Sequence, residues 1–61
     1  MSIIFVDRNY EMEGKLGVAL LDKDKELMNF YPYEGGAESF KNFVGKISWI
    51  IDLGFKFKIE P

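Results

Sequence analysis

The side chains that could do chemistry in this 61-residue chain are carboxylates, lysines, tyrosines, three serines and the single arginine, Arg8. General acid–base catalysis at neutral pH relies most often on histidine, and nucleophilic catalysis needs a cysteine or a hydroxyl activated by a neighbouring base. The sequence contains neither histidine nor cysteine. We therefore expect no catalytic residues, no enzymatic activity, no cofactor and no structural zinc or disulfide.

Two segments invite comparison with ion-binding loops. Asp22 to Glu26 places oxygens at alternate positions, as a calcium loop does, but Leu27 stands where such a loop has glycine and Tyr33 where it has glutamate. Glu34 to Gly36 precedes the predicted helix, yet Glu34 and Glu38 would repel a phosphate there. The sequence therefore predicts a hairpin turn, a strand-to-helix connection and no metal site.

Lysine and phenylalanine alternate near the C-terminal end, where Lys56 and Lys58 follow Phe55 and Phe57. Sheet-face RNA binders combine basic and aromatic side chains in this way. Adjacent side chains of a strand point to opposite faces, so these lysines and rings would not share one. Because the net charge is also −2, a nucleic-acid-binding accessory role is the alternative rather than the leading hypothesis.

A long amphipathic helix is the clearest element of the sequence. Its apolar residues recur with a period of 3.6 residues and form one stripe, which we expect to face the sheet. The stripe consists of Phe40, Phe43, Val44, Ile47, Ile50 and Ile51. We predict a helix from Ala37 to Leu53, with Gly36 or Ser39 as its N-cap. Gly54 should adopt the left-handed conformation of a Schellman motif, with Phe55 packing back on the last turn.

Trp49 lies on the side of this helix that faces away from the stripe. Asn42 shares that side, and Gly45, one turn before Trp49, lowers helix stability by about 1 kcal/mol relative to alanine. Tryptophan is enriched among binding hot spots. We interpret Trp49, Gly45 and Asn42 as partner-binding candidates. The structural alternative is that the ring folds back over Lys46 or Asp52, or packs under the N-terminal loop.

Four strands are predicted: Ile3 to Val6, Leu16 to Leu21, Glu26 to Tyr31 and Phe55 to Ile59. Asp7 to Asn9 is a turn signature in which Asn9 can take a positive φ. Tyr10 and Met12 alternate with glutamates, so the second strand could begin early, with Gly14 as a bulge. Pro32 should end the third strand.

The element order β-β-β-α-β indicates a small single α+β domain spanning residues 1–61. It should have a mainly antiparallel four-stranded sheet with one helix packed on one face. A right-handed crossover favours the last strand parallel to the first, giving the order 3-2-1-4. The order 1-2-3-4, with the last strand beside the third, is the alternative.

One helix covers only one face of such a sheet, so one apolar set should lack a cover. The two possible sets are Ile4, Val6, Ala19, Leu21, Met28 and Phe30, or a set that includes Ile3, Phe5, Val18 and Leu20. Monomers rarely expose large contiguous apolar patches. Leu21 and Phe30 on the open face, and Tyr31 and Tyr33 at its rim, are therefore further candidates for contact with another protein or a second copy.

The sequence contains no apolar run long enough to cross a membrane, and Asp7 interrupts the N-terminal apolar run before it could form a signal-peptide core. We therefore expect a cytoplasmic protein with no membrane partner. Residues with A/T-rich codons dominate, which suggests a phage or a low-GC bacterium. The leading hypothesis is a non-catalytic protein-binding module, such as an inhibitor or accessory factor, acting by occupying a partner's surface.

Overall fold

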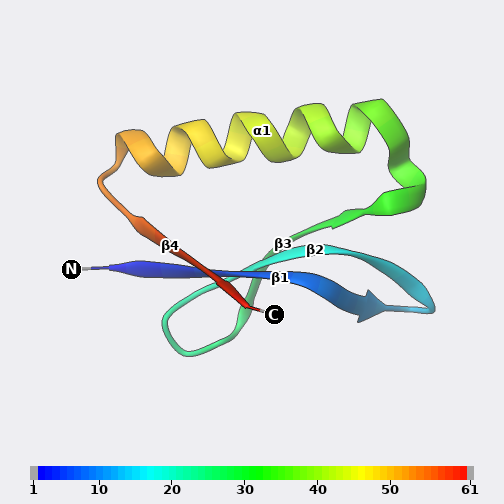
Figure 1. Cartoon of the computed structure of the whole chain (residues 1–61), viewed down its shortest axis with the longest axis horizontal. Helices are drawn as coiled ribbons and strands as arrows, with labels where there is room; N and C mark the ends of the chain where they lie inside the picture. Colours follow the sequence, from blue (N-terminus) through cyan, green and yellow to red (C-terminus); the bar gives the residue numbers. More distant parts are fainter. Residues whose placement is uncertain (1, 61) are drawn as a thin grey trace.

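The computed structural model describes residues 2–60, and its one sheet is covered on one side by a helix (Figure 1). The elements are β1 (Ile3–Met12), β2 (Lys15–Leu21), β3 (Leu27–Pro32), a 3₁₀ turn (Tyr33–Gly35), α1 (Gly36–Asp52) and β4 (Lys56–Glu60). The strand order is β3-β2-β1-β4, with β4 parallel to β1 and the other pairs antiparallel. The predicted α+β fold is confirmed, with the last strand beside the first.

The first strand continues past the predicted turn. Asp7 lies opposite Ala19 and Tyr10 opposite Gly17, so two residues of β1 oppose one of β2, as in a β-bulge. The Asp7 carboxylate accepts a hydrogen bond from the Asn9 N–H at 2.9 Å. The turn prediction for Asp7 to Asn9 was wrong, because this local bond bends the strand without reversing it. The chain reverses at Glu13 and Gly14, so Gly14, with φ of 80°, belongs to the hairpin turn and not to a bulge.

The predicted turn between β2 and β3 is confirmed, and it is organised by one carboxylate. Oδ1 of Asp22 accepts hydrogen bonds from the backbone N–H groups of Asp24 at 2.9 Å and Glu26 at 3.0 Å. The Asp22 N–H also donates to the Glu26 carbonyl at 2.9 Å. The first of the oxygens that resembled calcium ligands, that of Asp22, thus bonds to the chain's own backbone.

The helix ends as the sequence predicts. Gly54 has φ of 88°, its N–H donates to the Ile51 carbonyl at 2.9 Å, and the Phe55 N–H donates to the Ile50 carbonyl at 3.3 Å. These bonds define a Schellman motif. The start differs from the prediction. The N-cap is Gly35, which has no side chain to form a capping bond, and the 3₁₀ turn runs directly into the helix.

The core lies between α1 and the sheet face that α1 covers. Its buried centre consists of Ile4, Val6, Leu20 and Ile50, and the half-buried residues packed around it are Val18, Tyr31, Phe43, Ile47, Phe55 and Phe57. Val6 pairs with Leu20, and Phe5 with Leu21. The open face therefore combines Ile3 and Phe5 with Ala19 and Leu21, and neither predicted grouping was correct. The sequence did not reveal this register between β1 and β2.

Gly17 of β2 lies opposite Pro32 of β3, with the two backbones in close approach. A Cβ atom placed there would come within 2.3 Å of the Tyr31 carbonyl oxygen and 2.7 Å of Pro32 Cα. Both are backbone atoms, which cannot rotate away as the end of a side chain can. The pairing of β2 with β3 therefore requires glycine at this position.

We predict that Gly17→Ala lowers the free energy of unfolding by about 1–3 kcal/mol, because the extra methyl group forces the two strands apart. Urea titration followed by circular dichroism measures this change. Gly45→Ala is the matched control: a Cβ there meets no atom within 4 Å, and alanine favours a helix by up to about 1 kcal/mol. An unchanged stability of Gly17→Ala would contradict the close approach.

Candidate protein-binding surface

The apolar stripe of α1 is wider than its contact with the sheet. Ile50 is the buried residue of the helix, at 2% exposure, whereas Phe40, Val44 and Ile51 are 67%, 44% and 55% exposed. At 100° per residue these three lie roughly 80° to 120° around the helix from Ile50, all on one side. The expectation that the whole stripe faces the sheet was therefore wrong for half of its members.

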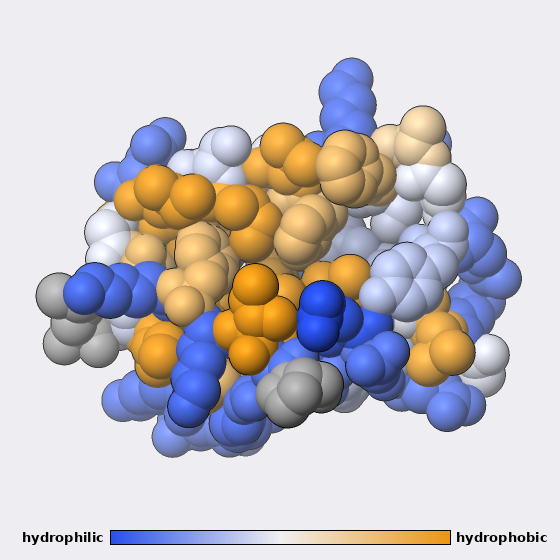
Figure 2. Space-filling model, in the orientation of Figure 1, coloured by the Kyte–Doolittle hydropathy of each residue, from blue (hydrophilic) through white to orange (hydrophobic). Residues whose placement is uncertain are grey.

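The exposed side chains of the stripe point toward the β1 and β4 side of the sheet. Phe40 lines a cavity together with Val18 of β2, whereas Asn42 lines a different one together with Phe30 of the edge strand β3. On β4, Ile59 lies beside Val6, on the face that α1 covers, and is 62% exposed. We call Phe40, Val44, Ile51 and Ile59 the apolar flank. Figure 2 shows apolar side chains gathered along α1 and continuing over the strands beneath it.

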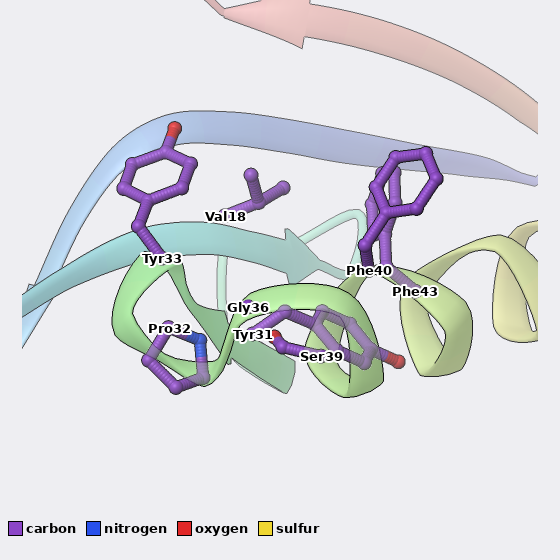
Figure 3. Close-up of a pocket in the computed structure, with 8 residues that line it drawn as sticks. All are labelled: Val18, Tyr31, Pro32, Tyr33, Gly36, Ser39, Phe40 and Phe43. Carbon is purple, nitrogen blue, oxygen red and sulfur yellow. The ribbon is translucent and has the colours of Figure 1, made fainter.

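A small cavity adjoins one end of the apolar flank. Its volume is about 250 Å³, and Figure 3 shows Tyr33 and Phe40 on either side of Val18. The lining residues are Val18, Tyr31, Pro32, Tyr33, Gly36, Ser39, Phe40 and Phe43. Small-molecule pockets usually measure about 300–1,000 Å³. This mostly apolar recess is better matched to a single side chain of a partner protein.

Tyr33 forms one wall of this cavity and is held in place by a hydrogen bond. Its hydroxyl donates to the backbone carbonyl of Arg8, at the bulge of β1. The ring itself stays mostly exposed. Tyr33, a partner-binding candidate from the sequence, therefore lies across the cavity from Phe40 of the apolar flank.

The other candidates on α1 lie on the opposite side of the helix. Trp49 is 54% exposed, and the Lys46 ammonium nitrogen lies 4.3 Å from the centre of its ring. Asn42 is exposed, and Gly45 has no neighbour within 4 Å of a Cβ position. The ring thus points away from the core and also folds against Lys46, so a partner would have to displace that lysine from one face of the indole.

Three candidates from the sheet take part in packing. Leu21 is only 7% exposed, because it lies between Phe5 of β1 and Leu27 of β3. Tyr31 packs edge-on against Phe43 with ring centres 5.4 Å apart, and burial raises the pKa of its hydroxyl. Phe30 is half-buried, and its ring centre lies 5.9 Å from that of Tyr10. Leu21 therefore has little surface left for a partner, whereas Tyr31 is half-buried and remains accessible through the cavity that it lines.

Lys56 and Lys58 are exposed on the open face of the sheet, opposite to Phe57, as expected from the alternation. Lys58 lies beside Phe5 on that face. The Lys25 ammonium already covers the Phe5 ring at 4.1 Å and also pairs with the Glu60 carboxylate. The face of the Phe5 ring that Lys25 covers is therefore not free for stacking on a base.

Within residues 2–60, no group of three or more acidic side chains is placed to hold a metal ion. None of the helices in that range is long and apolar enough to cross a membrane. No protein-family model matches the chain, and searches of curated proteins and of solved structures find no match. The apolar flank and its adjoining cavity are thus the features on which a functional proposal can rest.

The contact between Lys25 and Glu60 affects the pKa of the Glu60 carboxyl group. The hydrogen bond from Lys25 is the main cause that lowers the pKa of Glu60 below its ordinary value of 4.5, with the charges of Lys25 and Lys58 adding to it. We predict that Lys25→Met raises this pKa toward 4.5, as measured by NMR titration of the Glu60 carboxyl carbon. Lys23→Met, in the same turn, should leave it unchanged.

The same contact determines how the stability of the protein changes with pH. Because the folded-state pKa of Glu60 is lowered, its contribution to stability is present above pH 4.5 and is lost as the pH falls through the folded-state pKa. Wild-type protein should therefore lose more stability than Lys25→Met on acidification through that range. Equal losses in the two proteins would show that the ion pair does not form in solution.

Proposed function

We propose that this protein is a non-catalytic protein-binding module that acts by docking its apolar flank on another protein. The observation that carries the proposal is the exposure of Phe40, Val44 and Ile51 along one side of α1, and of Ile59 on the face of β4 that α1 covers. Exposed apolar residues scattered singly are normal, but a contiguous patch on a small protein is typical of an interaction site.

The composition of the surrounding surface supports this proposal. Interfaces combine an apolar centre with a polar rim. On the solvent side of the flank, Ser48 is exposed and follows Ile47 in the helix. Full burial of an aliphatic or aromatic side chain contributes about 1.5–3 kcal/mol, so covering the flank supplies a substantial driving force for association.

The adjoining cavity gives the surface a means of selection. A partner helix or loop lying along α1 could insert one apolar side chain between Tyr33 and Phe40. The fixed position of the Tyr33 ring, which is bonded to the Arg8 carbonyl, makes this recess part of the free protein. Preformed recesses reduce the entropy lost on binding.

Binding of this kind acts by occupancy, so we assign the protein the role of an inhibitor or accessory factor. A cysteine-free chain fits the reducing cytoplasm, where disulfides do not form. Trp49, on the opposite side of α1, is a secondary contact in this proposal, because Lys46 already covers part of its ring.

Site-specific photocrosslinking tests the proposal. We predict that a benzophenone side chain at position 40 or 51 forms adducts with a partner protein in lysate of the native cell, whereas the same group at Lys41 does not. Val44→Glu should reduce the adducts at position 40 by about 30-fold or more, as expected for a hot-spot loss of about 2 kcal/mol. Adducts are identified by mass spectrometry, so that partners of different kinds are distinguished.

The control is Lys41→Glu, which introduces the same charge on a neighbouring turn outside the flank. Circular dichroism and urea titration establish that each variant is folded. If positions 40, 41 and 51 give equal adducts, or if Val44→Glu leaves them unchanged while the protein is folded, the flank is not the binding surface.

A further inference from the structure

The outer edge of β4 is an unpaired strand edge. In the sheet order β3-β2-β1-β4, β4 has β1 as its single neighbour. The Lys56 N–H donates to the Ser2 carbonyl at 3.2 Å, which directs the backbone of Lys56 toward β1. Because successive residues of a strand direct their N–H and C=O groups to opposite sides, those of Phe57 and Ile59 point outward. Such an edge is a template for pairing with another strand.

We propose that a second copy of this chain pairs with this edge, β4 against β4 in antiparallel orientation, about a two-fold axis at Lys58. In this register Phe57 lies opposite Ile59 of the second copy. These are the residues with free outward backbone groups, so each such pair can exchange both hydrogen bonds. The inference goes beyond the proposed function: it uses Ile59 of the apolar flank and leaves Phe40, Val44 and Ile51 exposed for another protein.

The side chains of β4 are complementary to themselves in this arrangement. On the open face, Lys56 lies opposite Glu60 of the second copy, an attractive pair that the two-fold axis repeats. On the face that α1 covers, Phe57 lies opposite Ile59 and covers a side chain that is 62% exposed in the single chain. Both faces of the strand thus favour the same register.

The charge pattern also contains one unfavourable contact. Lys58 lies at the two-fold axis, opposite itself, and like charges directly across two strands are destabilising. The arrangement therefore predicts that removing this positive charge tightens association.

The other edge of the sheet is less suited to pairing. β3 ends in Pro32, which has no N–H to donate, and its register with β2 shifts at Leu21. The five residues of β4 pair with β1 without a shift. Among the described strands, the regular free edge is therefore that of β4.

The test uses the purified 61-residue chain and sedimentation velocity over a concentration series. Lys56→Glu places a carboxylate opposite Glu60 of the second copy, and Glu60→Lys places an ammonium opposite Lys56. Each variant alone should dimerise on the order of tenfold more weakly than wild type, whereas an equimolar mixture should recover wild-type affinity as a mixed dimer. Glu60→Gln controls for loss of the contact with Lys25.

Two further variants address the axis and the hydrogen bonds. Lys58→Thr should dimerise several-fold more tightly than wild type, since threonine also suits a strand. N-methylation of Ile59 in a synthetic chain removes an outward N–H without touching the ladder to β1, and it should abolish the dimer. Circular dichroism verifies that each chain is folded.

A wild-type chain that stays monomeric at millimolar concentration would overturn the inference, as would a mixture that associates no better than its two components. These outcomes are separate from those for the proposed function. Monomeric chain that still forms adducts at position 40 with another protein overturns the dimer and leaves the proposed function standing. Failure of the proposed function instead shows as equal adducts at positions 40, 41 and 51.

Discussion

The arrangement of this protein depends on the packing of Ile50 between helix and sheet. Its side chain is buried against Ile4, Val6 and Leu20, and within residues 2–60 it is the buried residue of α1. Its carbonyl also accepts hydrogen bonds from the N–H groups of Leu53 at 3.1 Å and Phe55 at 3.3 Å. One residue thus fixes the helix on the sheet and ends the helix so that β4 can return beside β1.

Anchoring at one buried position leaves much of the helix free. The accessible surface is 4387 Å², compared with about 4,100 Å² for a typical folded monomer of 7.1 kDa. Small domains bury a modest fraction of their surface, and association is one way to gain the missing stability. Because the apolar flank adjoins the core at Phe43 and Phe57, a partner that covers it would extend the same apolar contact.

The sequence predicted those features that are decided locally. Gly54 and the period of the apolar stripe are sufficient to place the end of α1 and its Schellman motif, and the polar tetrapeptide from Asp22 to Lys25 is sufficient to predict the turn after β2. The prediction of a turn at Asp7 to Asn9 was wrong because the same Asx hydrogen bond occurs in a turn and in a bulge, and only pairing with β2 distinguishes them.

The exposed side of the apolar stripe was also unpredictable, since periodicity identifies the apolar side of a helix but not the angle at which the helix crosses the sheet. Leu21 was misjudged for a related reason: its burial depends on cross-strand neighbours in a register that the sequence did not specify.

The charges on β4 are informative because of their order. A strand edge that carries charges of one sign repels every copy of itself, whatever the register, and natural edge strands use lysine in this way. β4 instead carries lysine at residue 56 and glutamate at residue 60, equally spaced about Lys58. An antiparallel copy reverses this order and brings unlike charges together at both ends, while the central lysines repel each other. Such a pattern selects one register and moderates its strength, which suits an association that forms and dissociates rather than a permanent one.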